Sequence, residues 1–206
     1  DAPYGWGGST ATLGHAIQLE NGPHPGRLMF ISYYSYGGGS NNYSIYSDDH
    51  GESFSFSDGM PTYIDGSGSN VTAGNRLNEA TGVELANGWV LSSARDSQND
   101  TSAAGPYRHH TLSRDGGSTW GETIKEKQLE DPKVLEGYFD GIAGIASGLL
   151  RVSEQGKQDI NRIIYSSPAA GWQRDQLQLK MSYDEGNTWP IAKTISWGGA
   201  AYSDLV

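Results

Sequence analysis

Cysteine is absent from this 206-residue chain, which excludes disulfide bonds and thiolate metal sites but leaves the cellular compartment open. Basic residues are few. Fourteen Lys and Arg stand against 24 Asp and Glu, and a net charge of −10 argues against nucleic acid or an acidic membrane surface as a partner. The longest apolar stretch, residues 141–152, is too short and too rich in glycine to span a bilayer. No metal motif is present, and no cofactor is expected.

Glycine and aromatic residues are abundant instead. With 29 Gly, 12 Tyr and 6 Trp, the composition indicates a turn-rich all-β protein whose core is packed with aromatic rings. Segment 122–136 has only a mild helical look and contains Asp131-Pro132, so we expect it to be a loop. Short alternating runs bounded by Gly, Asn, Asp or Pro predict strands at 27–35, 43–46, 89–94, 162–166 and 177–183.

One eight-residue pattern, Ser-x-Asp-x-Gly-x-Ser/Thr-aromatic, occurs three times. Its copies are SDDHGESF at 47–54, SRDGGSTW at 113–120 and SYDEGNTW at 182–189. The pattern predicts a hairpin turn, in which the Asp carboxylate accepts backbone N–H bonds, the Gly takes the left-handed conformation and the final ring packs inward. Such self-similarity in a strand-rich chain is typical of a β-propeller, and it gives the repeat a structural role.

The length of the chain limits how many propeller blades it can hold. A blade takes roughly 40 to 50 residues, so 206 residues make at most about four. An open ring would expose strand edges. We therefore expect residues 1–206 to form one propeller domain that is incomplete, with blades missing on both sides. Residues 1–14 are expected to be a loop entering a blade, and residues 202–206 to end within a strand.

Other segments carry a family resemblance. In order and spacing, the chain resembles the bacterial-type sialidases (neuraminidases) over essentially its whole length. The resemblance runs through GHAIQL at 14–19, GPHPGRL at 22–28, YSDDHG at 46–51, NEATGVELANG at 78–88, SSARDS at 92–97, Asp131-Pro132, Arg174 eight residues before Ser182, and AYSDL at 201–205.

The resemblance implies part of a six-bladed β-propeller and an exo-α-sialidase that releases terminal sialic acid, or a related nonulosonic acid, from glycoconjugates with retention. In the family, a tyrosine attacks the anomeric carbon with help from a glutamate, and arginines grip the substrate carboxylate. Matched residue by residue, Tyr202 resembles the nucleophile and Glu79 its base. Arg95 and Arg174 resemble two of the three carboxylate-binding arginines, a role that suits the guanidinium fork.

Each assignment has a simpler alternative. Tyr202 could be one of many packing tyrosines. Arg95 could be a charge that keeps a strand end in solvent, and Arg174 could pair locally with Asp175. Glu84 is the rival to Glu79. We favour Glu79 because the family pattern places the functional acid first, and an odd separation of five residues turns Glu84 to the opposite face of a strand.

The family pattern is incomplete in this chain. Its first binding arginine and its acid/base aspartate would lie before residue 14, and neither is found there. The loop after Pro132 also departs from the family. No other arginine lies in a motif that matches the family's first binding arginine; the unmatched candidates are Arg27, Arg76, Arg108, Arg151 and Arg162. Two alternatives to the enzyme therefore remain: a non-catalytic sialoglycan-binding propeller, and a structural propeller that shares only the repeats.

Localisation and the histidines complete the expectations. Glycosylation sequons at Asn42, Asn70 and Asn99 fall in turn-like polar stretches and weakly favour a secreted or extracellular protein, with a lysosomal or cell-surface one as alternatives. His24 is expected to be a surface side chain. In the strand-like run that holds His109 and His110, alternation should send one ring outward.

Two geometric expectations follow. Glu79, Arg95, Arg174 and Tyr202 should meet on one face near the propeller axis, with the Tyr202 hydroxyl in hydrogen-bond reach of Glu79. The three repeated turns should lie at the periphery, away from that cluster.

Overall fold

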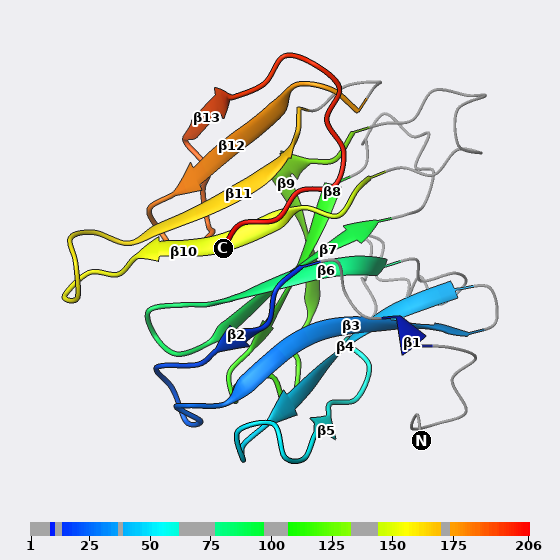
Figure 1. Ribbon diagram of the computed structural model, residues 1–206, viewed down its shortest axis with the longest axis vertical. Coiled ribbons are helices and arrows are strands. Elements are labelled where there is room, and N and C mark those ends of the chain that lie inside the picture. Colours follow the sequence, from blue (N-terminus) through cyan, green and yellow to red (C-terminus); the bar gives the residue numbers. More distant parts are fainter. Residues whose placement is uncertain are drawn as a thin grey trace.

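A computed structural model describes seven segments of the chain: residues 9–10, 14–36, 39–61, 77–96, 107–132, 144–169 and 174–206. Within these segments every regular element is a β-strand, and the strands form three antiparallel sheets. No helix in the described part is long and apolar enough to cross a membrane. Figure 1 shows the sheets following one another from blue through green to orange, with the second sheet between the other two.

The first sheet has five strands. Its main path runs β1-β3-β4-β5, and β2 pairs with β3 beside β1. The long hairpin of β3 and β4 forms its centre, in register from Leu28 opposite Ser47 to Tyr36 opposite Gly39. The strands are β1 Ser9–Thr10, β2 Ile17–Gln18, β3 Leu28–Tyr36, β4 Gly39–Ser47 and β5 Ser55–Phe56.

The second and third sheets are four-stranded meanders in which each strand pairs with the next along the chain. The second sheet contains β6 Leu77–Glu84, β7 Val90–Asp96, β8 Tyr107–Ser113 and β9 Thr123–Glu130. The third contains β10 Gly148–Ser153, β11 Arg162–Pro168, β12 Leu177–Ser182 and β13 Ile191–Thr194. Successive four-stranded meanders packed face to face are the blades of a β-propeller, so the chain folds as part of one.

The strands predicted from the sequence are confirmed, but two other expectations are wrong. Segment 122–136, expected to be a loop, contains β9. This is the outermost strand of its sheet. Its exposed positions carry both apolar and polar residues, Ile124, Lys127 and Gln128, so the sequence does not show the regular polar–apolar alternation that predicts a strand. Residues 202–206, expected to end within a strand, form none.

The three repeated turns are confirmed as hairpin turns with a common hydrogen-bond pattern. Each links the last two strands of its sheet: β4 to β5, β8 to β9 and β12 to β13. In the third copy, Asp184 accepts bonds from the Thr188 amide at 2.8 Å, the Thr188 hydroxyl at 2.6 Å and the Ser182 hydroxyl at 2.9 Å. The Gly186 amide donates to Ser182 Oγ at 2.9 Å. Asp49 and Asp115 make the same bonds in their copies.

Positive φ angles and lowered pKa values reflect this turn geometry. The repeat glycines have φ between 84° and 92°, as predicted, and the preceding residue is also left-handed, even where it is His50 or Glu185. Hydrogen bonds from the Ser53 side chain and backbone lower the pKa of Asp49 to about 2. For Asp115 and Asp184, burial acts in the raising direction, but the bonds from their Ser and Thr partners leave each pKa lowered.

The final ring of the repeat packs inward in the second and third copies and not in the first. Trp189 is 6% exposed and Trp120 packs against the core, but Phe54 is 50% exposed. The second turn contacts the first sheet and the third turn contacts the second sheet, so Trp120 and Trp189 each have a neighbour to pack on. The described residues place no such neighbour over Phe54. The inward prediction is therefore wrong for this residue.

The two contacts between neighbouring sheets are pseudo-equivalent. A Cβ on Gly117 would stand 2.7 Å from Met29 Cε, and one on Gly186 would stand 3.0 Å from Leu91 Cδ2, so each glycine lets its turn approach the preceding sheet. Two apolar clusters fill the contacts. The first contains Leu19, Met29, Ile31, Met60, Leu77, Ala80, Val90 and Ala94, and the second contains Val83, Leu85, Leu91, Leu129, Leu149, Ile163, Tyr165 and Trp189.

Arginine and glutamate side chains add polar links at these contacts. Arg27, almost fully buried, pairs with Asp48 at 2.7 Å and donates to the Gly116 carbonyl at 2.9 Å and to Ser118 Oγ at 2.7 Å. It therefore ties the second repeated turn to the first sheet. At the next contact, Glu185 accepts from the Ala86 amide at 2.8 Å and pairs with Arg151.

Three polar residues are more buried than the sequence indicated. Asn42 lies in β4 rather than in a turn and is fully buried, donating to the carbonyls of Ser32 and Asn78, so a glycan cannot be attached to it in the folded state. His109 and His110 are both buried, at 2% and 4% exposure, because each face of β8 is covered. His24 is half-buried beside Gly116 and so keeps part of its ring at the surface, as expected. Asn70 and Asn99 lie outside the described residues.

Candidate functional site

The antiparallel pairing gathers the predicted site residues of the second sheet at one of its ends. Leu77, at the start of β6, lies opposite Asp96, at the end of β7. Glu79 and Arg95 therefore lie at the same edge. The pairing shifts by a bulge between Leu77 and Ala80, which changes the local direction of the strand at Glu79.

Glu79 and Arg95 form a buried ion pair. Arg95 Nη1 lies 2.5 Å from Glu79 Oε2, and the two residues are 4% and 8% exposed. The Glu79 amide donates to Asn78 Oδ1 at 2.7 Å, and the Asn78 carbonyl accepts from Asn42 on the first sheet. The backbone at Asn78 and Glu79 is thus held by side-chain bonds, and Oε2 of the Glu79 carboxylate is directed at a guanidinium group.

Glu84, the rival of Glu79, has a different role. Its two carboxylate oxygens accept the backbone amides of Glu20 at 2.7 Å and Asn21 at 2.8 Å, at the far end of β6. Glu84 therefore anchors the turn between β2 and β3 and is occupied by structural bonds. The preference for Glu79 over Glu84 agrees with these contacts.

Arg174 and Tyr202 form a second pair. The Arg174 guanidinium carbon lies 5.7 Å from the centre of the Tyr202 ring, and the Ala200 amide donates to the Arg174 carbonyl at 2.9 Å. Tyr202 is 52% exposed, so its hydroxyl-bearing ring is accessible. Local ion pairing of Arg174 with Asp175 does not appear among the described contacts, although Arg174 makes further interactions.

The segment after Tyr202 is held along the start of β10. Ser203 Oγ lies 2.9 Å from Ser166 Oγ, and the Ser203 amide donates to the Ala146 carbonyl at 3.4 Å. Asp204 Oδ1 lies 3.0 Å from His15 Nδ1, which links this segment to the first sheet. A Cβ on Gly148 would stand 2.9 Å from the Leu205 amide nitrogen, so only glycine allows this approach. Figure 1 shows the red segment descending beside the yellow strands.

Gly144 joins the two pairs. Its carbonyl accepts from Arg174 Nη2 at 3.4 Å, and a Cβ in its place would stand 2.8 Å from Arg95 Cγ. Its φ of 73° also favours glycine. The structure therefore brings the four predicted residues together as two pairs joined at one glycine. The contact between the Tyr202 hydroxyl and Glu79 stays a prediction.

Two site residues have contacts that the sequence did not reveal. Arg108 is fully buried and donates to the carbonyls of Ser93 at 2.7 Å and Ile145 at 2.9 Å. Asp131, also fully buried, lies 3.5 Å from Arg108 Nη1. Burial raises the pKa of Asp131 to about 6, while the nearby charges of Arg108 and Arg95 act to lower it. The sequence does offer one signal for this pair: Arg108 is a charged residue inside a run patterned as a strand, and a buried charge needs a partner.

The repeated turns lie at the opposite end of the sheets. Val90, where β7 begins, pairs with Ser113, where the second turn begins, whereas Arg95 follows Ala94, which pairs with His109. Asp115 and Arg95 therefore lie at opposite ends of the strands of this sheet. The same order holds in the third sheet, where Arg174 precedes β12 and Asp184 follows it. The predicted separation of the turns from the site is confirmed.

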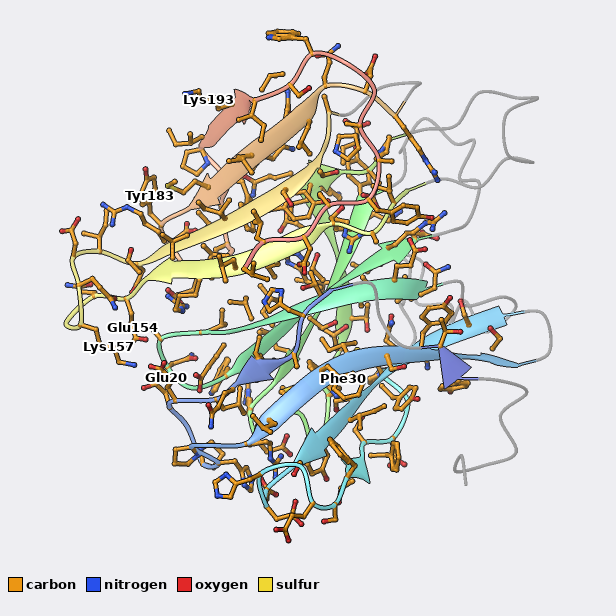
Figure 2. All side chains as sticks on the ribbon, viewed as in Figure 1. Glu20, Phe30, Glu154, Lys157, Tyr183 and Lys193 are labelled. Carbon is orange, nitrogen blue, oxygen red and sulfur yellow. The ribbon has the colours of Figure 1, made fainter. Side chains whose placement is uncertain are left out.

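A cleft of about 320 Å³ lies between β2, β6 and β10, and Glu84, Arg151 and Lys157 are among its lining residues. None of the four predicted site residues lines it. At its rim, Lys157 pairs with Glu20 at 2.8 Å and with Glu154 at 3.3 Å, and Figure 2 shows these three side chains close together. Its charged groups pair with one another, so we do not assign the site to this cleft. The described residues hold no group of three or more His, Asp or Glu able to bind a metal ion.

The fold and the paired charges define the class of protein: a propeller with repeated Asp turns at one end and an arginine-rich site at the other. Comparisons with known proteins narrow this class. The chain is 32% identical over 206 residues to a sialidase of Micromonospora viridifaciens, covering 98% of this chain and 27% of that protein. It is 29% identical over 199 residues to a sialidase of Vibrio cholerae, covering 93% of the chain and 25% of that protein. No family model matches the chain.

Solved structures agree on the fold. A microbial sialidase named Hz136 superposes with a TM-score of 0.72 at 22% identity, over 97% of this chain and 33% of that one. The intramolecular trans-sialidase of Ruminococcus gnavus gives 0.66 at 23% identity, over 92% of this chain and 35% of that one. The chain belongs to the bacterial-type sialidase family. It spans about a quarter of the length of the relatives that it matches in sequence.

Proposed function

We propose that this chain supplies part of the active site of an exo-α-sialidase, which hydrolyses terminal sialic acid or a related nonulosonic acid from glycoconjugates. The support is the family relationship together with the placement of Glu79, Arg95, Arg174 and Tyr202 at one end of the sheets. The remaining groups of such a site, an acid/base aspartate and a third arginine, belong to parts of the family pattern that this chain does not match.

In this proposal Arg95 and Arg174 bind the carboxylate of the sugar. A guanidinium group presents parallel N–H donors that match the two oxygens of a carboxylate, and the match is strongest where water is excluded. Arg95 is almost fully buried and Arg174 is half-buried, so both can act in partly desolvated surroundings. Gly144 lies against the side chain of Arg95 and accepts a hydrogen bond from Arg174, so both arginines lie beside one residue, which favours their binding one ligand.

Tyr202 attacks the anomeric carbon, and Glu79 accepts the phenolic proton. The sugar carboxylate sits on the carbon under attack, so a carboxylate nucleophile would meet like-charge repulsion that a phenol avoids. An unperturbed phenol has a pKa near 10 and needs a base in hydrogen-bond reach. Two displacements, by Tyr202 and then by water, return the original configuration at the anomeric carbon.

The observation that carries the proposal is the junction at Gly144. It brings a buried acid–arginine pair from the second sheet to an arginine–tyrosine pair from the third, although Glu79 and Tyr202 are far apart in sequence. Repeated turns alone would not produce such a cluster. A propeller that shared only the repeats would have no reason to hold these four residue types at one end.

The test is release of a fluorogenic leaving group from an α-sialoside by the whole protein, with the first-formed sugar anomer identified by proton NMR. We expect release and an initial α-anomer, because two inversions retain configuration. An initial β-anomer would disprove the covalent tyrosine route. A protein that binds the sialoside at every pH tried but releases nothing would be a sialoglycan-binding propeller and not an enzyme.

A further inference from the structure

Arg108 is the most completely buried arginine among the described residues, and no part of the proposed chemistry uses it. It lies at the start of β8, at the same end of the sheet as Glu79 and Arg95. A buried charge is expensive, and replacing a buried ion pair by apolar residues is often neutral for stability. Stability alone is therefore a weak reason for an arginine here.

The contacts of Arg108 are mainly with the backbone that carries the site. Its Nη2 donates to the Ser93 carbonyl at 2.7 Å and, more weakly, to the Glu79 carbonyl at 3.4 Å. Its Nη1 donates to the Ile145 carbonyl at 2.9 Å. Ser93 lies two residues before Arg95, and Ile145 follows Gly144 directly. One guanidinium group thus contacts the three stretches of chain that carry Glu79, Arg95 and the Gly144 junction.

Asp131 lies behind this arrangement. It is 3.5 Å from Arg108 Nη1 and 3.5 Å from the Tyr165 hydroxyl, and a Cβ on Gly144 would stand 3.0 Å from its Oδ2. These distances are at the limit of hydrogen bonding, so Asp131 acts mainly as the counter-charge of Arg108, whereas the short bonds of Arg108 go to carbonyl groups. Backbone carbonyl groups therefore hold the guanidinium group of Arg108 in place, and Asp131 balances its charge.

We infer that Arg108 is a positioning residue for the sialidase site: its guanidinium fork fixes the backbone of β6, β7 and the Gly144 segment, so that Glu79 and Arg95 keep their relative placement. The inference rests on the proposed function. Lysine cannot replace it, because a single ammonium group lacks the planar fork that reaches carbonyls on two sides.

Arg151 is a matched control. It also donates to a carbonyl of β6, that of Glu84, at 2.8 Å, and it also pairs with an acid, Glu185. It lies at the opposite end of the sheet, among the repeated turns. Arg151→Lys and Arg108→Lys therefore make the same chemical change to a carbonyl-bound, acid-paired arginine, one away from the site and one behind it.

The experiment compares the two variants in the whole protein at a temperature where circular dichroism shows both to be folded. Arg108→Lys should lower kcat by about 100-fold, the effect expected when reacting groups are misplaced by about 1 Å, whereas Arg151→Lys should leave kcat unchanged. Combining Arg108→Lys with Glu79→Gln should cost less than the product of the two single losses, because Arg108 acts through Glu79. Equal losses in both lysine variants, or fully multiplicative losses, would overturn the inference.

A structural readout separates this inference from the proposed function. Crystal structures of the two lysine variants should show the Glu79–Arg95 pair displaced in Arg108→Lys and unmoved in Arg151→Lys. If the unaltered protein turns over no sialoside, the proposed function fails, but this readout still decides the positioning role. If Arg108→Lys does not fold, the uncharged pair Arg108→Gln with Asp131→Asn replaces it in both measurements. An unmoved Glu79–Arg95 pair in Arg108→Lys, or in the double variant that replaces it, overturns the inference.

Discussion

The two ends of the sheets are built in different ways. At one end, three copies of one turn repeat the same bonds between residues two or four positions apart, as between Asp184 and Thr188. At the other end each sheet is different, and the bonds join residues far apart in sequence, such as Arg95 with Glu79 and Arg108 with Ile145. The comparison teaches that the turns are shaped by local, repeated bonds, to which links such as that of Arg27 to Gly116 attach the neighbouring sheet, whereas the candidate site is formed by long-range bonds that differ from sheet to sheet.

The largest effect expected from this comparison is at Tyr202. Tyr202→Phe removes the attacking oxygen but leaves the ring beside Arg174, so the turnover number should fall by at least about 10³-fold. Binding of a non-hydrolysable sialic acid analogue, measured by calorimetry, should persist. Turnover within tenfold of the unaltered protein would show that Tyr202 is not the nucleophile.

Arg174→Ala should act on binding rather than on scaffold stability. An arginine that pairs with a carboxylate in a shielded site contributes about 2 to 4 kcal/mol, so affinity for the same analogue should fall roughly 30- to 800-fold. The matched control is Arg162→Ala. Arg162 forms an exposed pair with Asp159 at 2.8 Å, which should have no effect on affinity. Equal affinity losses in both variants would remove Arg174 from the site.

The difference between the ends also explains what the sequence could predict. The repeated turns were predicted in detail because the bonds that shape each turn are local. Only the packing of Phe54 failed, since ring packing depends on a neighbouring sheet. Glu79 and Arg95 were found through the family pattern, but the ion pair between them was not, because a pattern gives order and no distance. Arg108 and Asp131 were missed as a pair, because residues 23 positions apart become partners only after β8 and β9 have formed.

The two sheet contacts differ at the position of His110. This residue occupies the position of Ser44, since each lies three residues before the serine that opens a repeated turn. Trp120 Nε1 donates to Ser44 Oγ at 3.1 Å, whereas Trp189 Nε1 and His110 Nε2 are both buried without a partner among the described residues. Burial lowers the pKa of His110 to about 3, with Arg108 and His109 acting in the same direction, so the ring stays neutral in the folded state.

His110→Ser should make the second contact resemble the first and weaken the acid sensitivity of the fold. With a folded pKa below the unfolded value of 6.5, His110 contributes stability that is complete above pH 6.5 and is lost as pH falls toward 3. At pH 5 this loss is about 2 kcal/mol. Urea unfolding at pH 7 and pH 5 should show a drop smaller by that amount in the variant. Only the pH dependence is compared, because the smaller serine also leaves a cavity; an unchanged drop would contradict the role of His110.

The smallest effect is expected at the turn end, from Asp184→Ala. The change removes the acceptor for the Thr188 amide and hydroxyl, whose bonds are exposed to solvent, and for the hydroxyl of Ser182, which is buried. A net contribution of about 1 kcal/mol per bond, reduced because water replaces part of each, predicts a loss of about 1 to 2 kcal/mol in the free energy of unfolding. The turnover number should be unchanged, because Asp184 lies across the sheet from Arg174. A fall in turnover comparable to that of Arg108→Lys, in protein shown to be folded, would mean that the two ends are coupled and that the division between scaffold and site is wrong.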